Sequence, residues 1–194
     1  MNVRDVLQQR TRGTTFETRE NENGKKTIAG YFVVFNSETE LFPGAFESVD
    51  PGAFDETLGG DIRALTNHDT TLVLGRTKSG TLMLRIDSHG LWGEIEINEN
   101  DMDALNLYER VRRGDVDQCS FGFDIKEEET EWRENGTVKW TIKKVELYEV
   151  SVCTFPAYED TGVQARHKAV GTYKETQLKA MKQNSMNKLK GGKE

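Results

Sequence analysis

The sequence of 194 residues predicts an α+β domain that is mainly antiparallel β, a closed or nearly closed barrel with a few helices on its outside. Short runs with β-branched and aromatic residues recur along the chain, and turn signals rich in Gly, Asn and Pro separate them. Only residues 102–113 combine the apolar spacing of an amphipathic helix with capping residues at both ends.

The first half of the chain is predicted to form hairpins and short turns. Residues 14–19 with 27–35, and residues 81–87 with 91–98, flank polar segments that contain glycine, which is the pattern of a β-hairpin. The segments between these hairpins are predicted as turns at the Pro-Gly pairs 43–44 and 51–52, a short helix at 53–58, and strands at 61–68 and 71–76.

The second half begins with the predicted helix at residues 102–113. Asn100 or Asp101 can cap its start, and Gly114 can end it in a left-handed conformation. The remaining elements are predicted strands at 116–125, 138–145 and 147–154, with the charged stretch 126–136 as a hairpin tip.

The charge and the apolar runs of the chain argue against two functional classes, nucleic-acid-binding domains and membrane-spanning proteins. Seven lysines and two glutamates give residues 167–194 a net charge of +5, so residues 1–166 carry −12 within the total of −7. An acidic body argues against a nucleic-acid-binding domain, because affinity for phosphates comes mainly from Lys and Arg. The longest apolar run, residues 31–35, is too short to span a membrane. We therefore expect no specific nucleic-acid partner and no membrane.

Cysteine and histidine are scarce. Two cysteines and three histidines, at spacings unlike those of metal sites, predict no disulfide framework, no metal and no cofactor, and they fit a reducing compartment. We expect three parts: an N-terminal arm at residues 1–13, one domain at residues 14–166, and a basic, flexible C-terminal tail at residues 167–194, with a weak helix at 176–189.

Ser120 is the first candidate for chemistry. In the strand predicted at residues 116–125, the apolar residues at odd positions form a core face. Ser120 and Gly122 lie on the other face, where a serine can act as a nucleophile if a base is within hydrogen-bond distance. On the strand pattern alone, a solvent-facing serine without a catalytic role is the simpler interpretation.

Three histidines are available as that base. His68 ends the strand predicted at residues 61–68, and strand ends commonly line clefts, whereas His89 lies in a predicted turn and His167 begins the tail. The alternative for a single histidine is a surface or structural residue. Asp69 follows His68 directly and points to the other face of an extended chain, so it is poorly placed to orient the imidazole.

Glu149 is the candidate that would hold the base. It lies within residues 145–155, where both faces of the predicted strand are largely apolar. A carboxylate buried in such a strand costs several kcal/mol unless it is paired or hydrogen-bonded. An imidazolium is a suitable partner, and Arg63, Arg76 or a lysine are the alternatives.

Several segments together resemble the prohead, or procapsid maturation, serine proteases of tailed bacteriophages. The order and spacing of the segments agree with that family over residues 14–166. The segments are Ile28–Asn36; Pro51–Asp55 with Asn67–Asp69 and Val73–Arg76; Arg113–Asp115 with Cys119–Phe123; and Leu147–Val152 with Pro156–Tyr158.

The resemblance implies a fold similar to that of herpesvirus assembly proteases, an antiparallel β-barrel surrounded by helices. It implies His68 as the general base and Ser120 as the nucleophile. The related viral proteases use a second histidine as the third catalytic residue. Here neither His89 nor His167 lies in a matching segment, so Glu149 is assigned to that position.

The resemblance also implies a function. The chain would be a serine endopeptidase that cleaves itself and the major capsid protein with its scaffolding region, or a separate scaffold, inside the immature capsid (prohead) in the host cytoplasm. Its partners would be those proteins and further copies of itself. Arg166 is assigned to support of the oxyanion, by likeness to arginines in a late loop of related viral proteases. The basic tail is a candidate for docking to an acidic scaffold or capsid surface.

Two other functions remain open. One is a catalytically silent barrel that serves as a capsid assembly or scaffolding partner, which would have no need of a complete Ser, His and Glu set. The other is an esterase-type hydrolase. It is disfavoured because the serine lies in Gln118–Gly122, QCSFG, and not in a Gly-x-Ser-x-Gly turn.

Overall fold

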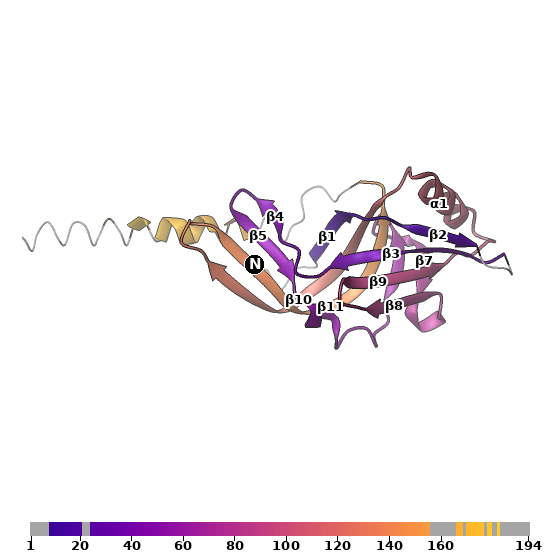
Figure 1. Ribbon diagram of the computed structural model, residues 1–194, viewed down its shortest axis with the longest axis horizontal. Coiled ribbons are helices and arrows are strands. Elements are labelled where there is room, and N and C mark those ends of the chain that lie inside the picture. Colours follow the sequence, from indigo (N-terminus) through magenta and orange to yellow (C-terminus); the bar gives the residue numbers. More distant parts are fainter. Residues whose placement is uncertain are drawn as a thin grey trace, which may run out of the picture.

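The computed structural model describes residues 8–20, 24–155, 166–168, 170–176, 178–179 and 182. These residues form two curved β-sheets with helices beside them (Figure 1). The fold is α+β and mainly antiparallel, as the sequence predicts. Within the described residues, no helix has the length and apolar character that crossing a membrane requires.

The smaller sheet is antiparallel throughout and has the order β2-β3-β9-β8. Its strands are β2 (Glu17–Glu20), β3 (Lys26–Val34), β8 (Leu82–Ile86) and β9 (Gly90–Glu96). These pairings confirm the two hairpins predicted for this part of the chain. Residues 21–23, in the turn of the first hairpin, lie outside the described part.

The larger sheet is built on one long hairpin, formed by β10 (Gln118–Trp132) and β11 (Val138–Cys153). The sequence predicts shorter strands, with residues 126–136 as the tip and a break near residue 146. Both strands instead continue, with residues 127–132 paired to residues 138–144 across the hairpin, and opposite charges lie side by side on it, as Lys143 Nζ and Glu129 Oε2 do at 3.6 Å. Figure 1 shows the outer half of this hairpin extending away from the smaller sheet.

Shorter strands cover both edges of this hairpin. β1 (Gln8–Gly13) pairs antiparallel with β10 and places Thr11 opposite Ser120. β5 (Ala45–Val49) and β6 (Arg63–Thr66) pair with β11 in parallel. β4 (Thr39–Phe42) and β7 (Asp69–Arg76) then pair with β5 and β6. The sheet is therefore mixed. The sequence predicts a mainly antiparallel fold and does not reveal these two parallel pairs, because pairing between segments so distant in sequence leaves no local pattern.

The helical elements follow the expected caps. The predicted helix at residues 102–113 is confirmed as α1 (Met102–Arg113): Asp101 Oδ1 accepts from the N–H groups of Asp103 and Ala104, and Gly114 ends the helix at φ 82°. In place of the helix predicted at 53–58, a single 3-10 turn spans Pro51–Phe54, and another spans Thr77–Ser79.

The main core lies between the two sheets and α1. The odd-numbered face of β10 is buried there, from Cys119 at 0% exposure to Ile125 at 1%, as the strand pattern predicts. The rings of Phe121 and Phe123 stack at 4.6 Å, and Phe54 meets Phe121 edge to face at 6.1 Å. This packing fixes the direction of the even-numbered residues of β10, Ser120 among them, which point to the opposite face of the strand.

The described residues between 166 and 182 are helical and lie beside the outer half of the β10–β11 hairpin (Figure 1). Tyr173 stacks on Trp132 at 3.7 Å, and Val170 packs in a small second cluster with Trp140. Helix thus begins earlier than the one predicted at 176–189. Residues 1–7, 156–165 (which include Pro156–Tyr158) and 183–194 lie outside the described part, and the division into arm, domain and tail stays a prediction.

Candidate active site

The register of three neighbouring strands brings the predicted site residues together. Across the β10–β11 hairpin, Ser120 lies opposite Ser151 and Gly122 lies opposite Glu149. Opposite residues on antiparallel strands have Cβ atoms about 5 Å apart, so these side chains share one face of the sheet. On the other side of β11, β6 ends at Thr66, beside Val152, and the chain then turns back through Asn67 and His68.

The turn that carries His68 has an unusual backbone. Asn67 and His68 have φ values of 51° and 62°, in the left-handed region that side chains other than Gly seldom adopt. Asn67 accommodates this through its polar side chain, whose Oδ1 accepts from the N–H of Thr154 at 2.8 Å. The main-chain N–H of Asn67 also donates to the carbonyl of Val152 at 3.0 Å. The turn is thereby attached to the end of β11.

His68 and Glu149 form a close pair. His68 Nδ1 lies 2.7 Å from Glu149 Oε1, and the two side chains are 17% and 11% exposed. When Nδ1 carries the proton and donates it to the carboxylate, Nε2 is left as the basic nitrogen of a neutral imidazole. This is the arrangement in which a carboxylate orients a catalytic histidine and stabilises its cation.

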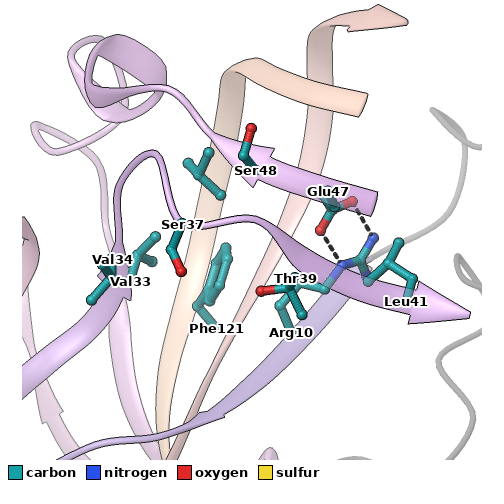
Figure 2. Close-up of a pocket in the computed structure, with 10 residues that line it drawn as sticks. Arg10, Val33, Val34, Ser37, Thr39, Leu41, Glu47, Ser48 and Phe121 are labelled. Atoms are coloured by element: carbon teal, nitrogen blue, oxygen red, sulfur yellow. Dashed lines mark hydrogen bonds and ion pairs between the residues drawn. The ribbon is translucent and has the colours of Figure 1, made fainter. Parts of the chain in front are cut away.

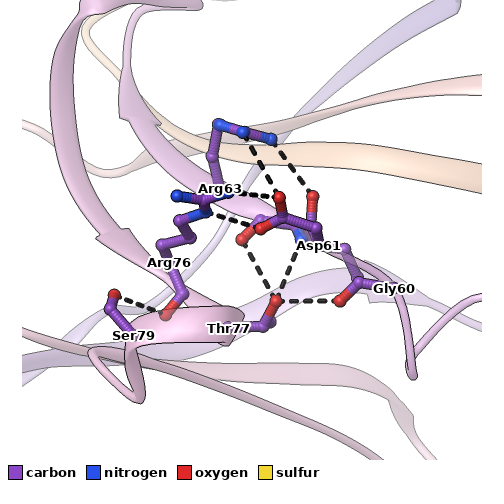
Figure 3. A network of polar contacts seen from close by, with 7 residues as sticks. Gly60, Asp61, Arg63, Arg76, Thr77 and Ser79 are labelled. Carbon is purple, nitrogen blue, oxygen red and sulfur yellow. Dashed lines mark hydrogen bonds and ion pairs between the residues drawn. The ribbon is translucent and has the colours of Figure 1, made fainter.

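The alternative partners for Glu149 are engaged elsewhere. Arg76 binds both carboxylate oxygens of Asp61, with Nε at 2.6 Å from Oδ1, and Arg63 lies 3.4 Å from Oδ2 (Figure 3). The hydrogen bond from Arg76 lowers the pKa of Asp61 to about 2. Thr77 Oγ1 accepts from the N–H of Ile62 and donates to the carbonyl of Gly60. This network closes the base of the β6–β7 hairpin, whose tip carries His68.

Gly122 provides the space in which Glu149 lies. A Cβ atom built on Gly122 would lie 2.3 Å from Glu149 Oε1 and about 3 Å from the next two carbons of that side chain. Such a distance is far inside van der Waals contact. The carboxylate therefore passes directly over the glycine, and no larger residue fits there without moving it.

Ser120 is buried beside this pair. Its exposure is 0%, so the interpretation as a solvent-facing strand serine is wrong. Among the described residues, neither Ser120 Oγ nor His68 Nε2 has a hydrogen-bond partner. Both therefore keep their hydrogen-bonding capacity free, although no hydrogen bond joins them here. Such bonds are often long before a substrate is bound.

Arg166 does not lie near Ser120, His68 and Glu149. Its guanidinium is 1% exposed and lies 3.0 Å from Glu47 and 2.8 Å from Glu128, over the ring of Trp140. Glu128 is eight positions beyond Ser120 on β10, which corresponds to roughly 25 Å of strand. In the described structure, Arg166 therefore holds the C-terminal helix to the hairpin and has no contact with the Ser120 site.

A cavity of about 240 Å³ is lined by Phe121, the residue next to Ser120, but it lies on the other side of the sheet. It is lined by Phe121, by residues of β3 to β5, and by the ion pair of Arg10 and Glu47 (Figure 2). Because Phe121 and Ser120 are neighbours on a strand, they point to opposite faces. This cavity is therefore separate from the candidate site.

Ser151 is a member of this group that the sequence reasoning missed. Its hydroxyl donates to Glu149 Oε2 at 2.6 Å and accepts from the main-chain N–H of His68 at 3.2 Å. The only signal in the sequence is its place two residues after Glu149, on the same face of the strand. A small hydroxyl at such a position is common and does not by itself indicate a role.

Comparisons with known proteins find similarity in both sequence and fold. A family profile described as Caudovirus prohead serine protease matches residues 14–183. The prohead protease of Enterobacteria phage HK97 is 30% identical over 148 residues, which cover 74% of this chain and 61% of that protein. The solved structure of the bacteriophage T4 capsid assembly protease aligns with a TM-score of 0.50 at 12% identity, over 76% of this chain and 96% of that one. This last likeness concerns the fold alone.

Proposed function

Because the chain belongs to the family of caudovirus prohead serine proteases, we propose that it is a serine endopeptidase of phage capsid maturation, with Ser120, His68 and Glu149 as its catalytic residues. The observation that carries this assignment is the 2.7 Å contact between His68 Nδ1 and Glu149 Oε1 on the sheet face of Ser120. It supports a base whose free nitrogen is Nε2, beside a serine whose hydroxyl has no hydrogen-bond partner in the described part of the chain.

The proposed mechanism follows from these positions. His68 Nε2 removes the proton of Ser120 as Oγ attacks the carbonyl carbon of a peptide bond. The imidazolium formed is stabilised by Glu149 and gives its proton to the leaving amine, which departs as the acyl-enzyme forms. Water then repeats the sequence on the acyl-enzyme and releases Ser120. Because Ser120 is buried, a peptide gains access only after a displacement of the groups that cover it.

The substrates proposed are capsid precursors. The relatives are named prohead protease and capsid assembly protease, and this chain spans about 61% of the length of the HK97 protein. We propose the major capsid protein with its scaffolding region as substrate and partner, and the protease itself as a second substrate. Cleavage would occur inside the prohead in the host cytoplasm.

A silent scaffolding protein with the same barrel is the second candidate. It requires the barrel surface but not the contact between His68 and Glu149. Those two residues lie 81 positions apart in sequence, and the strained backbone at His68 is maintained to bring them together. Strain of this kind is concentrated at functional sites, so the catalytic proposal is favoured.

Co-expression with the capsid protein encoded beside this chain tests the proposal. We expect the wild type to shorten the capsid protein and Ser120→Ala to leave it full length, with equal amounts of both proteases. Ser48→Ala, a change at a buried serine of β5 outside the site, is the matched control and should cleave like the wild type. A capsid protein that stays full length with every variant would support the scaffolding function instead.

A further inference from the structure

Ser151 closes a ring of hydrogen bonds that begins and ends on His68. The main-chain N–H of His68 meets Ser151 Oγ at 3.2 Å, the Ser151 hydroxyl meets Glu149 Oε2 at 2.6 Å, and Glu149 Oε1 meets His68 Nδ1 at 2.7 Å. We propose that Ser151 is a positioning residue, which fixes both the orientation of Glu149 and the tautomer of His68 in the reaction proposed above.

The direction of each hydrogen bond in this ring is determined. A main-chain N–H can only donate, so it occupies a lone pair of Ser151 Oγ. The one hydroxyl proton of Ser151 is then directed to Glu149 Oε2, which must accept. An ionised carboxylate has no proton to donate, so it accepts at Oε1 as well, and His68 Nδ1 donates there. The ring thus selects the tautomer in which Nε2 carries no proton and can act as a base.

Burial of the Ser151 hydroxyl increases the cost of losing its hydrogen bonds. Ser151 is 0% exposed and Glu149 is 8% exposed, so water cannot readily replace a lost donor. The same serine is attached to the turn in which His68 adopts φ 62°. Its removal would leave the carboxylate with one protein donor fewer and release one of the contacts that hold the strained turn.

A positioning role has a distinct kinetic signature. Ser151 contacts Glu149 and His68, and its one hydroxyl proton is directed to Glu149, so we expect it to affect the chemical step and not substrate binding. A lost hydrogen bond to a buried charged group corresponds to a fall in kcat of about 10- to 100-fold, with KM unchanged.

The test compares Ser151→Ala, Ser151→Thr and Ser151→Cys with the wild type and with Ser48→Ala. Activity is measured on a fluorescent peptide that spans the junction cut in the co-expression experiment. The proton on His68 Nδ1 is observed by NMR in protein labelled with ¹⁵N-histidine, and thermal unfolding shows that each variant is folded. We expect Ser151→Ala to lose kcat and to lose or broaden the Nδ1 proton signal, and Ser151→Thr, which keeps the hydroxyl, to recover both.

Wild-type kcat and an unchanged Nδ1 signal in folded Ser151→Ala would overturn the proposal. If the alanine variant does not fold, Ser151→Cys takes its place, because cysteine has a similar shape but is a weak donor. We expect this variant to lose kcat and the Nδ1 proton signal. Wild-type values of both in Ser151→Cys would also overturn the proposal. This inference rests on the proposed function, but the NMR signal requires no activity. Failure of the protease assignment, seen as uncut capsid protein with the wild type, is therefore distinguished from failure of the ring.

Discussion

Burial of the Glu149 carboxylate is unfavourable by itself, yet the proposed mechanism requires this carboxylate beside His68. Its carboxylate lies in a strand that is buried on both faces, and its two oxygens accept from His68 and Ser151. A buried carboxylate without these partners would be strongly unfavourable, so the ring stabilises the charge that the imidazolium requires during catalysis. Gly122 belongs to the same arrangement, because its missing side chain makes room for the carboxylate.

Gly122→Ala should inactivate the protease without unfolding it. The new methyl group would overlap Glu149 Oε1 and push the carboxylate away from His68. A displacement of about 1 Å at a catalytic group typically costs about 100-fold in rate. The measurement is kcat on the junction peptide, with Gly59→Ala as control, since nothing lies within 4 Å of a Cβ at that glycine. Equal activity of both variants would show that the position of Glu149 is not critical.

At the scale of elements, the β6–β7 hairpin presents His68, the proposed general base. Its tip is tied to the end of β11 through Asn67 and Ser151, and its base is closed by the network around Asp61 (Figure 3). Parallel pairing of β6 with β11 sets the position of this tip relative to Glu149. Because the hairpin is held at both its tip and its base, the turn at Asn67 and His68 keeps a fixed position.

Asp61→Asn should destabilise the protein in a manner that depends on pH. Arg76 lowers the pKa of Asp61 from 3.8 to about 2. The ionised Asp61 therefore stabilises the folded state fully above about pH 4, and this contribution is lost as the pH falls toward 2. We expect a lower Tm for the variant at pH 7 and a difference from the wild type that narrows below pH 4. A Tm difference that stays constant down to pH 2 would contradict this.

At the scale of the whole molecule, one buried carboxylate joins both terminal segments to the sheet. Glu47 on β5 contacts Arg10 of β1 at 2.5 Å and Arg166 of the C-terminal helix at 3.0 Å. Burial would raise the pKa of Glu47, but its interactions with the two arginines outweigh this and keep the pKa below its usual value. Strand β1, which pairs with β10 beside Ser120, is thereby connected to the same carboxylate as the C-terminal helix.

Arg166→Ala should lower the free energy of unfolding by about 3–5 kcal/mol, because it removes the arginine that pairs with Glu128 and leaves buried Glu47 with Arg10 alone. Urea unfolding measures this difference. Lys168→Ala, at an exposed position of the same helix, is the control and should change stability by less than about 0.5 kcal/mol. If the two variants were equally stable, the helix would not be held by this ion pair.

The sequence predicted the parts of this structure that have local patterns. Both hairpins of the smaller sheet, α1 and its caps, and the core face of β10 were found from spacing, turn residues and alternation. Ser120, His68 and Glu149 were selected by strand faces together with the family resemblance, and the close contact of the last two agrees with that selection.

The features that were missed depend on long-range pairing. No strand was predicted at Ala45–Val49, between the turns at the two Pro-Gly pairs. Its neighbour β4 is short, and its other partner, β11, is almost a hundred residues away. The charges at Glu127–Glu129 resembled a hairpin tip, although Glu128 is partly buried against Arg166. Ser151 escaped notice because its role rests on a main-chain N–H of a distant turn.

The central claim is that Ser120 is a nucleophile activated by His68, and active-site labelling tests it most directly. The full chain is treated with a fluorophosphonate, which forms a covalent bond with activated serines, and the modified peptide is located by mass spectrometry. We predict one adduct, on Ser120 of the wild type, that forms at least 100-fold more slowly in His68→Ala and is absent in Ser120→Ala. Labelling of Ser120 at the same rate in the wild type and in His68→Ala, or no adduct on Ser120 in protein that cuts the capsid precursor, would contradict the assignment.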